Sequence, residues 1–135
     1  MSLEKIIDDI LAEFDCQTAT LHRAAGEMLH MVHSVGIPAQ ILDKVKTIPF
    51  GKGIAGVAAA TQEPVELCNL QQDLGGVAKE GARKTGVAGS LAIALINSEG
   101  AVVGTIGIGK VSPHDFSDEE KERLKIQSMK LLEFV

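Results

Sequence analysis

The sequence predicts an α+β fold in which one antiparallel sheet packs against helices, and three observations lead to that prediction. A helical pattern opens the chain, short runs with strand character follow in pairs joined by tight turns, and a second helical pattern closes the chain. Such an order is typical of a sheet layer covered by helices. A chain of 135 residues has the size of one domain, so we expect residues 1–135 to form a single domain.

The first elements are an amphipathic helix and a hairpin. The spacing predicts a helix over Leu3–Phe14 that Ser2 caps, because its apolar residues recur every three or four positions. These residues are Leu3, Ile6, Ile7, Ile10, Leu11 and Phe14. Alternation with a period of two then predicts strands over Gln17–Ala24 and Glu27–Ser34, joined at Gly26.

The middle of the chain is less regular. Proline is well tolerated at the first position of a helix, so a short helix is expected over Pro38–Val45. An alanine-rich helix is predicted over Ile54–Thr61 and a brief strand over Pro64–Leu70. The segment Gln71–Gly89 has no clean period and many glycines, and an irregular stretch of that length is typically functional or mobile.

A second hairpin and a final helix complete the predicted fold. The strands are Ser90–Asn97 and Ala101–Lys110, and the last helix begins at Ser117, which forms a capping box with Glu120. The apolar residues of Leu124–Val135 point around most of the helix circumference, so this helix needs more than one packing partner.

Composition excludes several partners. The formal net charge is −5, and the chain has four Phe but no Trp or Tyr, which argues against electrostatic or stacking interactions with nucleic acid. The longest apolar runs are too short to cross a membrane, and the N-terminus lacks the parts of a signal peptide. Cys16 and Cys68 lack zinc-type spacing and are typical of thiols in a reducing compartment. We expect a cytoplasmic protein with no membrane contact.

A glycine cluster gives one misleading signal. Residues 51–56 read GKGIAG, which fits the GxGxxG pattern of dinucleotide-binding proteins. That pattern needs a buried strand before it, and Pro49 makes the preceding residues a poor core strand. We interpret the glycines as positions where the backbone turns and packs closely against the sheet.

The surroundings of this cluster carry a resemblance to a known family. Residues 48–65, IPFGKGIAGVAAATQEPV, followed by Asn69-Leu70, resemble the central signature of the GAF domain family. GSLAIAL at 89–95, VGTIGI at 103–108 and FSDEE at 116–120 are similar to its later strands and the start of its last helix, although Ala94 replaces a frequent proline. The resemblance implies a six-stranded antiparallel sheet with the terminal helices on one face and a small-molecule pocket on the other. It also implies a sensory role and pairing through the terminal helices.

Strand parity separates the two faces of the predicted sheet. Leu91, Ile93, Leu95, Ile106 and Ile108 share the face that helices would bury, whereas the other face carries small residues. That face either holds a ligand or is filled by the backbone of Gln71–Gly89. If a ligand binds, parity and the resemblance together predict the following site residues: Ile54, Asn69, Leu70, Asp73, Ser90, Ala92, Thr105 and Gly107.

Other chemistry within the family is less well supported. The free methionine-(R)-sulfoxide reductases of the family use cysteines beside the central glycines and in the later loop. This chain has Ala55 among the central glycines and no cysteine over 71–89. Cys68 has no role assigned by that pattern. The residues associated with cyclic-nucleotide binding match only in part. His30 and His33 are expected on opposite faces of one strand, so we predict no metal site, and no cofactor.

The sequence therefore predicts a non-catalytic regulatory domain in signal transduction that binds a small molecule of unknown identity. It is expected to form a homodimer through Leu3–Phe14 and Leu124–Val135. A dimerisation module without a ligand remains the alternative, and a reductase is the less favoured one.

Overall fold

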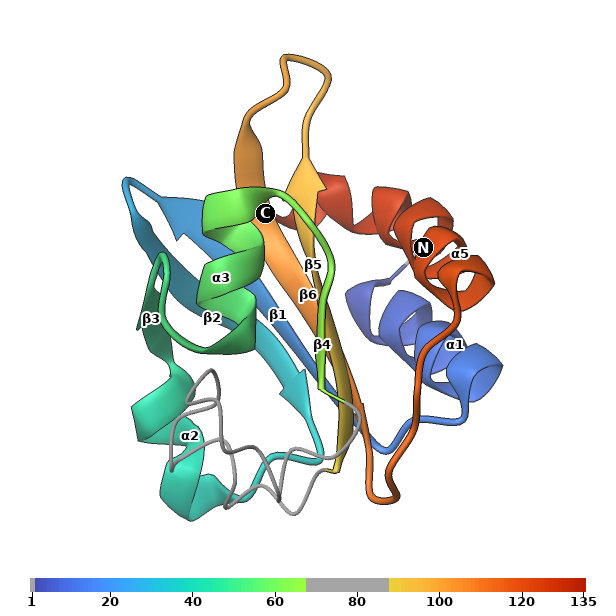
Figure 1. The fold of residues 1–135 in the computed structure, drawn as a ribbon. Coiled ribbons are helices and arrows are strands. Elements are labelled where there is room, and N and C mark those ends of the chain that lie inside the picture. Colours follow the sequence, from blue (N-terminus) through green and yellow to red (C-terminus); the bar gives the residue numbers. More distant parts are fainter. Residues whose placement is uncertain (1, 68–87) are drawn as a thin grey trace.

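A computed structural model describes residues 2–67 and 88–135 of the chain. Within these residues, six strands form one antiparallel sheet in the order β3-β2-β1-β6-β5-β4, with the two three-residue strands at its edges (Figure 1). The terminal helices lie on one side of the sheet and helix α3 lies on the other. The predicted α+β fold, with its six-stranded sheet and helices, is confirmed.

The bounds of the elements follow the sequence pattern closely. In chain order they are α1 (Leu3–Phe14), β1 (Thr18–Ala25), β2 (Met28–Val35), α2 (Ala39–Val45), β3 (Thr47–Pro49), α3 (Gly53–Thr61), β4 (Val65–Leu67), β5 (Gly89–Ile96), β6 (Val102–Lys110), α5 (Asp118–Ser128) and the 3₁₀ helix η2 (Met129–Phe134). The sequence pattern predicts no strand at 47–49. β3 exists as an edge strand, where a proline can pair on one side only.

The side chains that bind the helices to the sheet are those predicted. Ile7 and Ile10 of α1 are buried with Leu91, Ile106 and other bulky residues of β5 and β6 in one apolar cluster. Leu124 of α5 and Leu131 of η2 complete this cluster and are fully buried. Apolar burial against the terminal helices therefore fixes which way each residue of β5 and β6 faces.

Helix α1 begins and ends at defined caps. The side chain of Ser2 accepts a hydrogen bond from the Lys5 N–H, as the sequence predicts. At the other end, Asp15 adopts a left-handed conformation with φ of 53°, and its N–H bonds to the carbonyl of Leu11. The chain can then turn directly into β1.

A register shift between β1 and β2 changes one prediction. Leu21 pairs with His33 and His22 pairs with Met31, so Val32 has no cross-strand partner and forms a bulge. Because His30 pairs with Arg23, both His30 and His33 fall on the face of Leu21. The expectation that they lie on opposite faces is therefore wrong, because the extra residue resets the alternation.

The glycine cluster shapes the approach to α3. Gly51 and Gly53 have φ of 87° and 65°, and the Gly51 N–H bonds to the carbonyl of Gly56 at 2.8 Å. A Cβ atom at Gly56 would lie 2.5 Å from the carbonyl oxygen of Pro49. These contacts bear out the interpretation that the glycines serve turning and close packing.

The C-terminal segment changes helix type along its length. Ser117 and Glu120 form the predicted capping box at the start of α5. At Met129 the α-helix gives way to the narrower η2, whereas the sequence pattern predicts one helix over 117–135. Glu66 of β4 ties this region to the sheet edge, because its carboxylate accepts the Phe116 N–H at 3.1 Å and pairs with Lys121.

Within residues 2–67 and 88–135 we find no helix that could cross a membrane. None of the helices there combines the length and the hydrophobicity needed to cross a bilayer.

Candidate functional site

The sheet face opposite the terminal helices is built in rows of paired residues. One row contains Ala92, Gly107 and Thr20, and the next contains Ala94, Thr105 and His22. Cross-strand partners share a face, so all six side-chain positions point the same way. We call these six residues the small-residue face. Hydroxyl, imidazole and small apolar groups thus meet on the central strands β5, β6 and β1.

Helix α3 covers one end of this side of the sheet. Its Ala55 and Ala59 pack with Leu29 in an apolar cluster that also includes Ala24, Phe50 and Val102. Small side chains on α3 allow the helix to approach the strands closely. Beyond this cluster, Thr20 and Gly107 are only half-buried, so solvent reaches part of the small-residue face.

The structure brings together half of the predicted site residues. Ala92, Thr105 and Gly107 belong to the small-residue face, and Ser90 pairs with Gly109 in the next row of the same side. Ile54 lies half-buried in the first turn of α3, outside the cluster that joins that helix to the sheet. The other predicted site residues lie outside the described residues: Asn69, Leu70 and Asp73.

His22 is the site residue that sequence reasoning missed. Only 1% of it is exposed, and its Nε2 lies 2.8 Å from the carbonyl oxygen of Val45. Val45 is the last residue of α2, where carbonyls have no partner within the helix, so His22 satisfies one of them. Neighbouring residues of a strand face opposite sides of the sheet, so His22 faces away from the side that contains Leu21. This alternation was the signal that could have identified His22 as a candidate site residue.

Two polar atoms on this face lack hydrogen-bond partners in the part of the chain that the structure describes. They are Nδ1 of His22 and Oγ1 of Thr105, which belong to directly paired residues of β1 and β6. Thr105 is fully buried. Each unsatisfied buried polar atom costs about 1–3 kcal/mol, so a pair of them in one place is an unusual concentration of unmet bonding capacity.

Burial sets the protonation state of this histidine. It lowers the pKa of His22 below the usual 6.5; the bond to Val45 opposes the shift and the nearby His30 reinforces it. At neutral pH the ring is therefore uncharged. Its Nδ1 is a hydrogen-bond acceptor, because the single ring proton is on Nε2, which faces a carbonyl oxygen.

The described thiol has no catalytic character. Cys16 belongs to the apolar cluster under the terminal helices, on the opposite side of the sheet from the small-residue face. Burial raises its pKa to about 11, so the nucleophilic thiolate is rare at neutral pH. Cys68 lies outside the described residues. Among residues 2–67 and 88–135, no three His, Cys, Asp or Glu side chains gather as metal ligands would.

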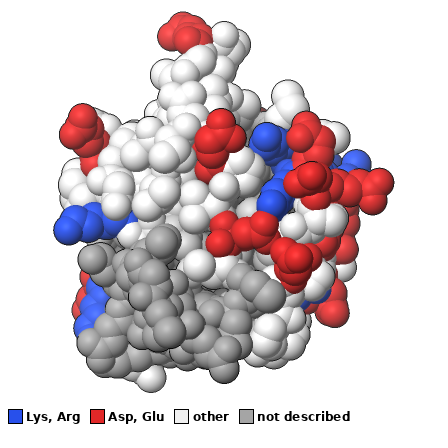
Figure 2. Space-filling model, viewed as in Figure 1, with Lys and Arg blue, Asp and Glu red and all other residues white. Residues whose placement is uncertain are grey.

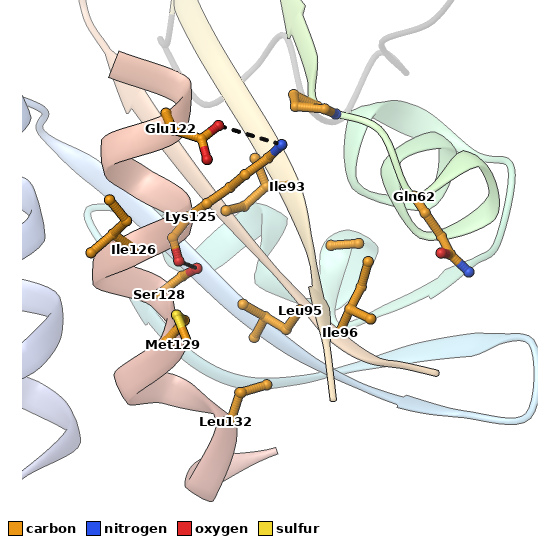
Figure 3. Close-up of a pocket in the computed structure, with 12 residues that line it drawn as sticks. Gln62, Ile93, Leu95, Ile96, Glu122, Lys125, Ile126, Ser128, Met129 and Leu132 are labelled. Carbon is orange, nitrogen blue, oxygen red and sulfur yellow. Dashed lines mark hydrogen bonds and ion pairs between the residues drawn. The ribbon is translucent and has the colours of Figure 1, made fainter. Parts of the chain in front are cut away.

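A concavity lies between β5 and α5. It has a volume of about 350 Å³, and Ile96, Ile126, Met129 and Leu132 contribute apolar side chains to it, with Glu122 and Lys125 at its rim (Figure 3). Ile126 and Met129 are 52% and 67% exposed. The face of α1 that contains Ile6, Ile7 and Ile10 is instead buried within the domain.

Charge is distributed unevenly over the surface. Acidic and basic side chains gather over the terminal helices, whereas separate acidic groups lie at the top and near the centre of the same view (Figure 2). The residues that line the groove between β5 and α5 therefore border a charged surface, and the small-residue face has only the neutral His22 as a titratable group.

A single antiparallel sheet, with the terminal helices on one side and α3 beside a small-residue face on the other, defines an α+β domain. The GAF domain family model matches residues 2–129, so this chain belongs to the GAF domain family. A search of the curated proteins finds no match to it.

Solved structures with the same fold are distant in sequence. Free methionine-R-sulfoxide reductase from Neisseria meningitidis, solved with its substrate, is 17% identical with a TM-score of 0.77, over 97% of this chain and 73% of that one. The NreA protein from Staphylococcus aureus, mutated in its nitrate binding site, is 18% identical with a TM-score of 0.70. The match covers 91% of this chain and 95% of the NreA chain. A further GAF domain is 20% identical with a TM-score of 0.68 over 88% of this chain, which spans 65% of that chain's length.

Proposed function

We propose that this protein is a regulatory domain that binds a small molecule on the small-residue face and does no chemistry on it. The observation that carries the proposal is the pair of buried, unpartnered polar atoms on His22 and Thr105. Polar groups that converge among small and apolar residues are typical of ligand sites. Nitrate in NreA and the substrate of the reductase are small polar molecules that domains of this fold bind.

A thermal-shift screen of small polar metabolites tests this proposal. A specific ligand at 100 times its Kd should raise the free energy of unfolding by about 2.7 kcal/mol. Thr105→Val removes the hydroxyl at nearly constant volume and should weaken that stabilisation. Thr47→Val, at an exposed position on the edge strand β3, is the matched control and should leave it unchanged. Stabilisation by no compound, or equal stabilisation of both variants, would contradict binding at this face.

The reductase alternative has a direct assay. The N. meningitidis enzyme shares the fold, and the buried Cys16 is unsuited to attack a sulfoxide, so any such activity would depend on Cys68. We expect no thiol-dependent reduction of free methionine-R-sulfoxide. Turnover that Cys68→Ser abolishes would replace the regulatory proposal by an enzymatic one.

We also propose that the groove between β5 and α5 holds a second copy of this chain, as a homodimer through the C-terminal helices. The supporting observation is the exposure of Ile126 and Met129 beside an apolar concavity. Glu122 and Lys125, 3.9 Å apart, give its rim both charges, so two copies related by a two-fold axis would present opposite charges to each other. α1 contributes less than the sequence suggests, because its apolar face is already covered.

Sedimentation velocity over a range of concentrations tests the dimer. Met129→Glu should raise the dimer dissociation constant at least about tenfold, because it places a charge in a buried apolar interface. Val111→Glu introduces the same charge at a residue that is 63% exposed but outside the groove, and should leave the dissociation constant unchanged. A wild-type protein that sediments as a monomer at every concentration would rule the dimer out.

A further inference from the structure

The orientation of the His22 ring limits what can bind beside it. A carbonyl oxygen only accepts hydrogen bonds, so the Nε2 that faces the Val45 carbonyl at 2.8 Å must carry the ring proton. A neutral imidazole has a single N–H. The buried Nδ1 is therefore a bare acceptor, held in place by the last carbonyl of α2.

The surroundings of His22 keep the ring neutral. Among the described residues, His30 on β2 acts on His22, because a positive charge there would disfavour a second one on the His22 ring. On α2 and just after it, Asp43, Lys44 and Lys46 are exposed to solvent, where water screens them. Helix α3 has no titratable residue, and on β6 the only one is Lys110, at the far end of the strand from Thr105.

Thr105 complements this acceptor. Directly paired residues in an antiparallel sheet have Cβ atoms about 4.5–5.5 Å apart, so the Thr105 hydroxyl and the His22 ring are neighbours on one face of the sheet. They do not bond to each other. A hydroxyl can donate or accept, whereas Nδ1 can only accept, and the pair together therefore requires at least one incoming donor.

We propose that the ligand of the small-residue face presents an N–H or O–H donor to Nδ1 of His22 and a neighbouring polar atom to the Thr105 hydroxyl, as a carboxamide does. This inference rests on the proposed function and narrows its ligand class. A nitrate or carboxylate oxygen would place lone pairs against the Nδ1 lone pair and leave that acceptor unsatisfied. Sites built around a particular hydrogen bond reject analogues that cannot make it.

The test compares amides with carboxylates of the same shape. The pairs are acetamide with acetate and nicotinamide with nicotinate, with inorganic nitrate as a fifth probe, each titrated into the ¹⁵N-labelled protein at pH 7.5. Long-range ¹H–¹⁵N spectra of the imidazole rings report directly whether Nδ1 of His22 accepts a hydrogen bond. We expect each amide to bind at least about tenfold more tightly than its carboxylate and to shift the Nδ1 resonance.

Two variants with matched controls separate the partners. His22→Gln places an amide N–H where Nε2 donates to Val45 but removes the Nδ1 acceptor, and its control is His33→Gln on the other side of the sheet. Thr105→Val is compared with Thr47→Val. The preference for amides should fall to about threefold or less in His22→Gln and Thr105→Val and persist in both controls. The wild-type Nδ1 signal needs no variant, so the test holds even if His22→Gln fails to fold.

The outcomes distinguish this inference from the proposed function. Tighter binding of carboxylates or nitrate, with resonances of Thr105 and Gly107 shifted but Nδ1 unmoved, overturns the donor requirement and leaves ligand binding in place. An Nδ1 resonance that already shows a full hydrogen bond in free protein, and does not change with amides, also overturns it. If none of the five compounds binds, the donor requirement is overturned for small amides. The proposed function is then tested by the thermal-shift screen alone.

Discussion

A Cβ atom built on Gly56 would lie 2.5 Å from the carbonyl oxygen of Pro49, closer than real Cβ contacts come. The two residues belong to α3 and β3, so this contact sets how closely the helix and the edge strand approach each other. The close approach holds the turn over 51–56 in place, with the Gly51 N–H bonded to the Gly56 carbonyl.

Gly56→Ala should therefore destabilise the protein even though alanine favours helices. The gain in helix propensity is about 1 kcal/mol, and displacing a backbone carbonyl in a packed region costs about 1–3 kcal/mol or more. We expect a net loss of about 1 kcal/mol or more in chemical denaturation. Gly107→Ala is the control, because its Cβ would meet the Thr20 hydroxyl, the movable end of a side chain, at 3.1 Å, and the Leu91 carbonyl oxygen at an ordinary contact distance of 3.9 Å. A Gly56→Ala protein as stable as wild type would show that α3 can shift freely.

The buried histidine should make stability depend on pH. Because the pKa of His22 is lowered in the folded protein, the unfolded chain binds more protons below about 6.5, and stability falls as the pH falls from there toward the folded pKa. The slope from this one group is at most about 1.4 kcal/mol per pH unit. Denaturation between pH 5 and 7.5 measures it.

His22→Gln should flatten that slope, whereas His33→Gln should retain it. Glu120 contributes to stability in a lower pH range. Burial raises its pKa, but the hydrogen bonds from Ser117 and His114 outweigh this and lower the pKa from 4.5, so the stability that Glu120 contributes is lost only below pH 4.5. An unchanged slope in His22→Gln would mean that His22 does not titrate differently in the folded and unfolded chains.

The 3₁₀ segment should contribute to stability as a core element. Leu131 is fully buried under the sheet, so Leu131→Ala should cost about 2–5 kcal/mol through lost burial and the cavity left behind. Met129 lies two residues earlier but is 67% exposed, and Met129→Ala should change the monomer's stability by less than about 0.5 kcal/mol. Denaturation at a protein concentration where sedimentation shows only monomer compares the two. Similar losses for both would show that η2 is packed differently.

Much of the fold could be predicted from the sequence because the pattern and the packing agree. The stripe of α1 and the alternation of Leu91, Ile93 and Ile106 gave the correct side of the sheet, since a one-residue slip would expose every bulky side chain. The bulge at Val32 has no comparable signal. It depends on how two strands fit each other, and it moved His33 to the other side of the sheet.

The candidate site was predictable only where strand parity sufficed. Ser90, Ala92, Thr105 and Gly107 followed from alternation, and they lie on one side as predicted. The role of His22 depends on the carbonyl of Val45, 23 positions later, and on what lies beside its Nδ1. Such long-range hydrogen bonding is not encoded in any local pattern.

The sheet that separates the two sides is one strand thick, so Thr105 and Ile106 are joined by a single peptide bond and yet face different surroundings. Under the proposed function, substitutions at the first position would alter which ligand is bound, whereas substitutions at the second alter how the domain is held together. A lineage built on this scaffold would then exchange one ligand for another, a few small side chains at a time, while its helical layer stays intact.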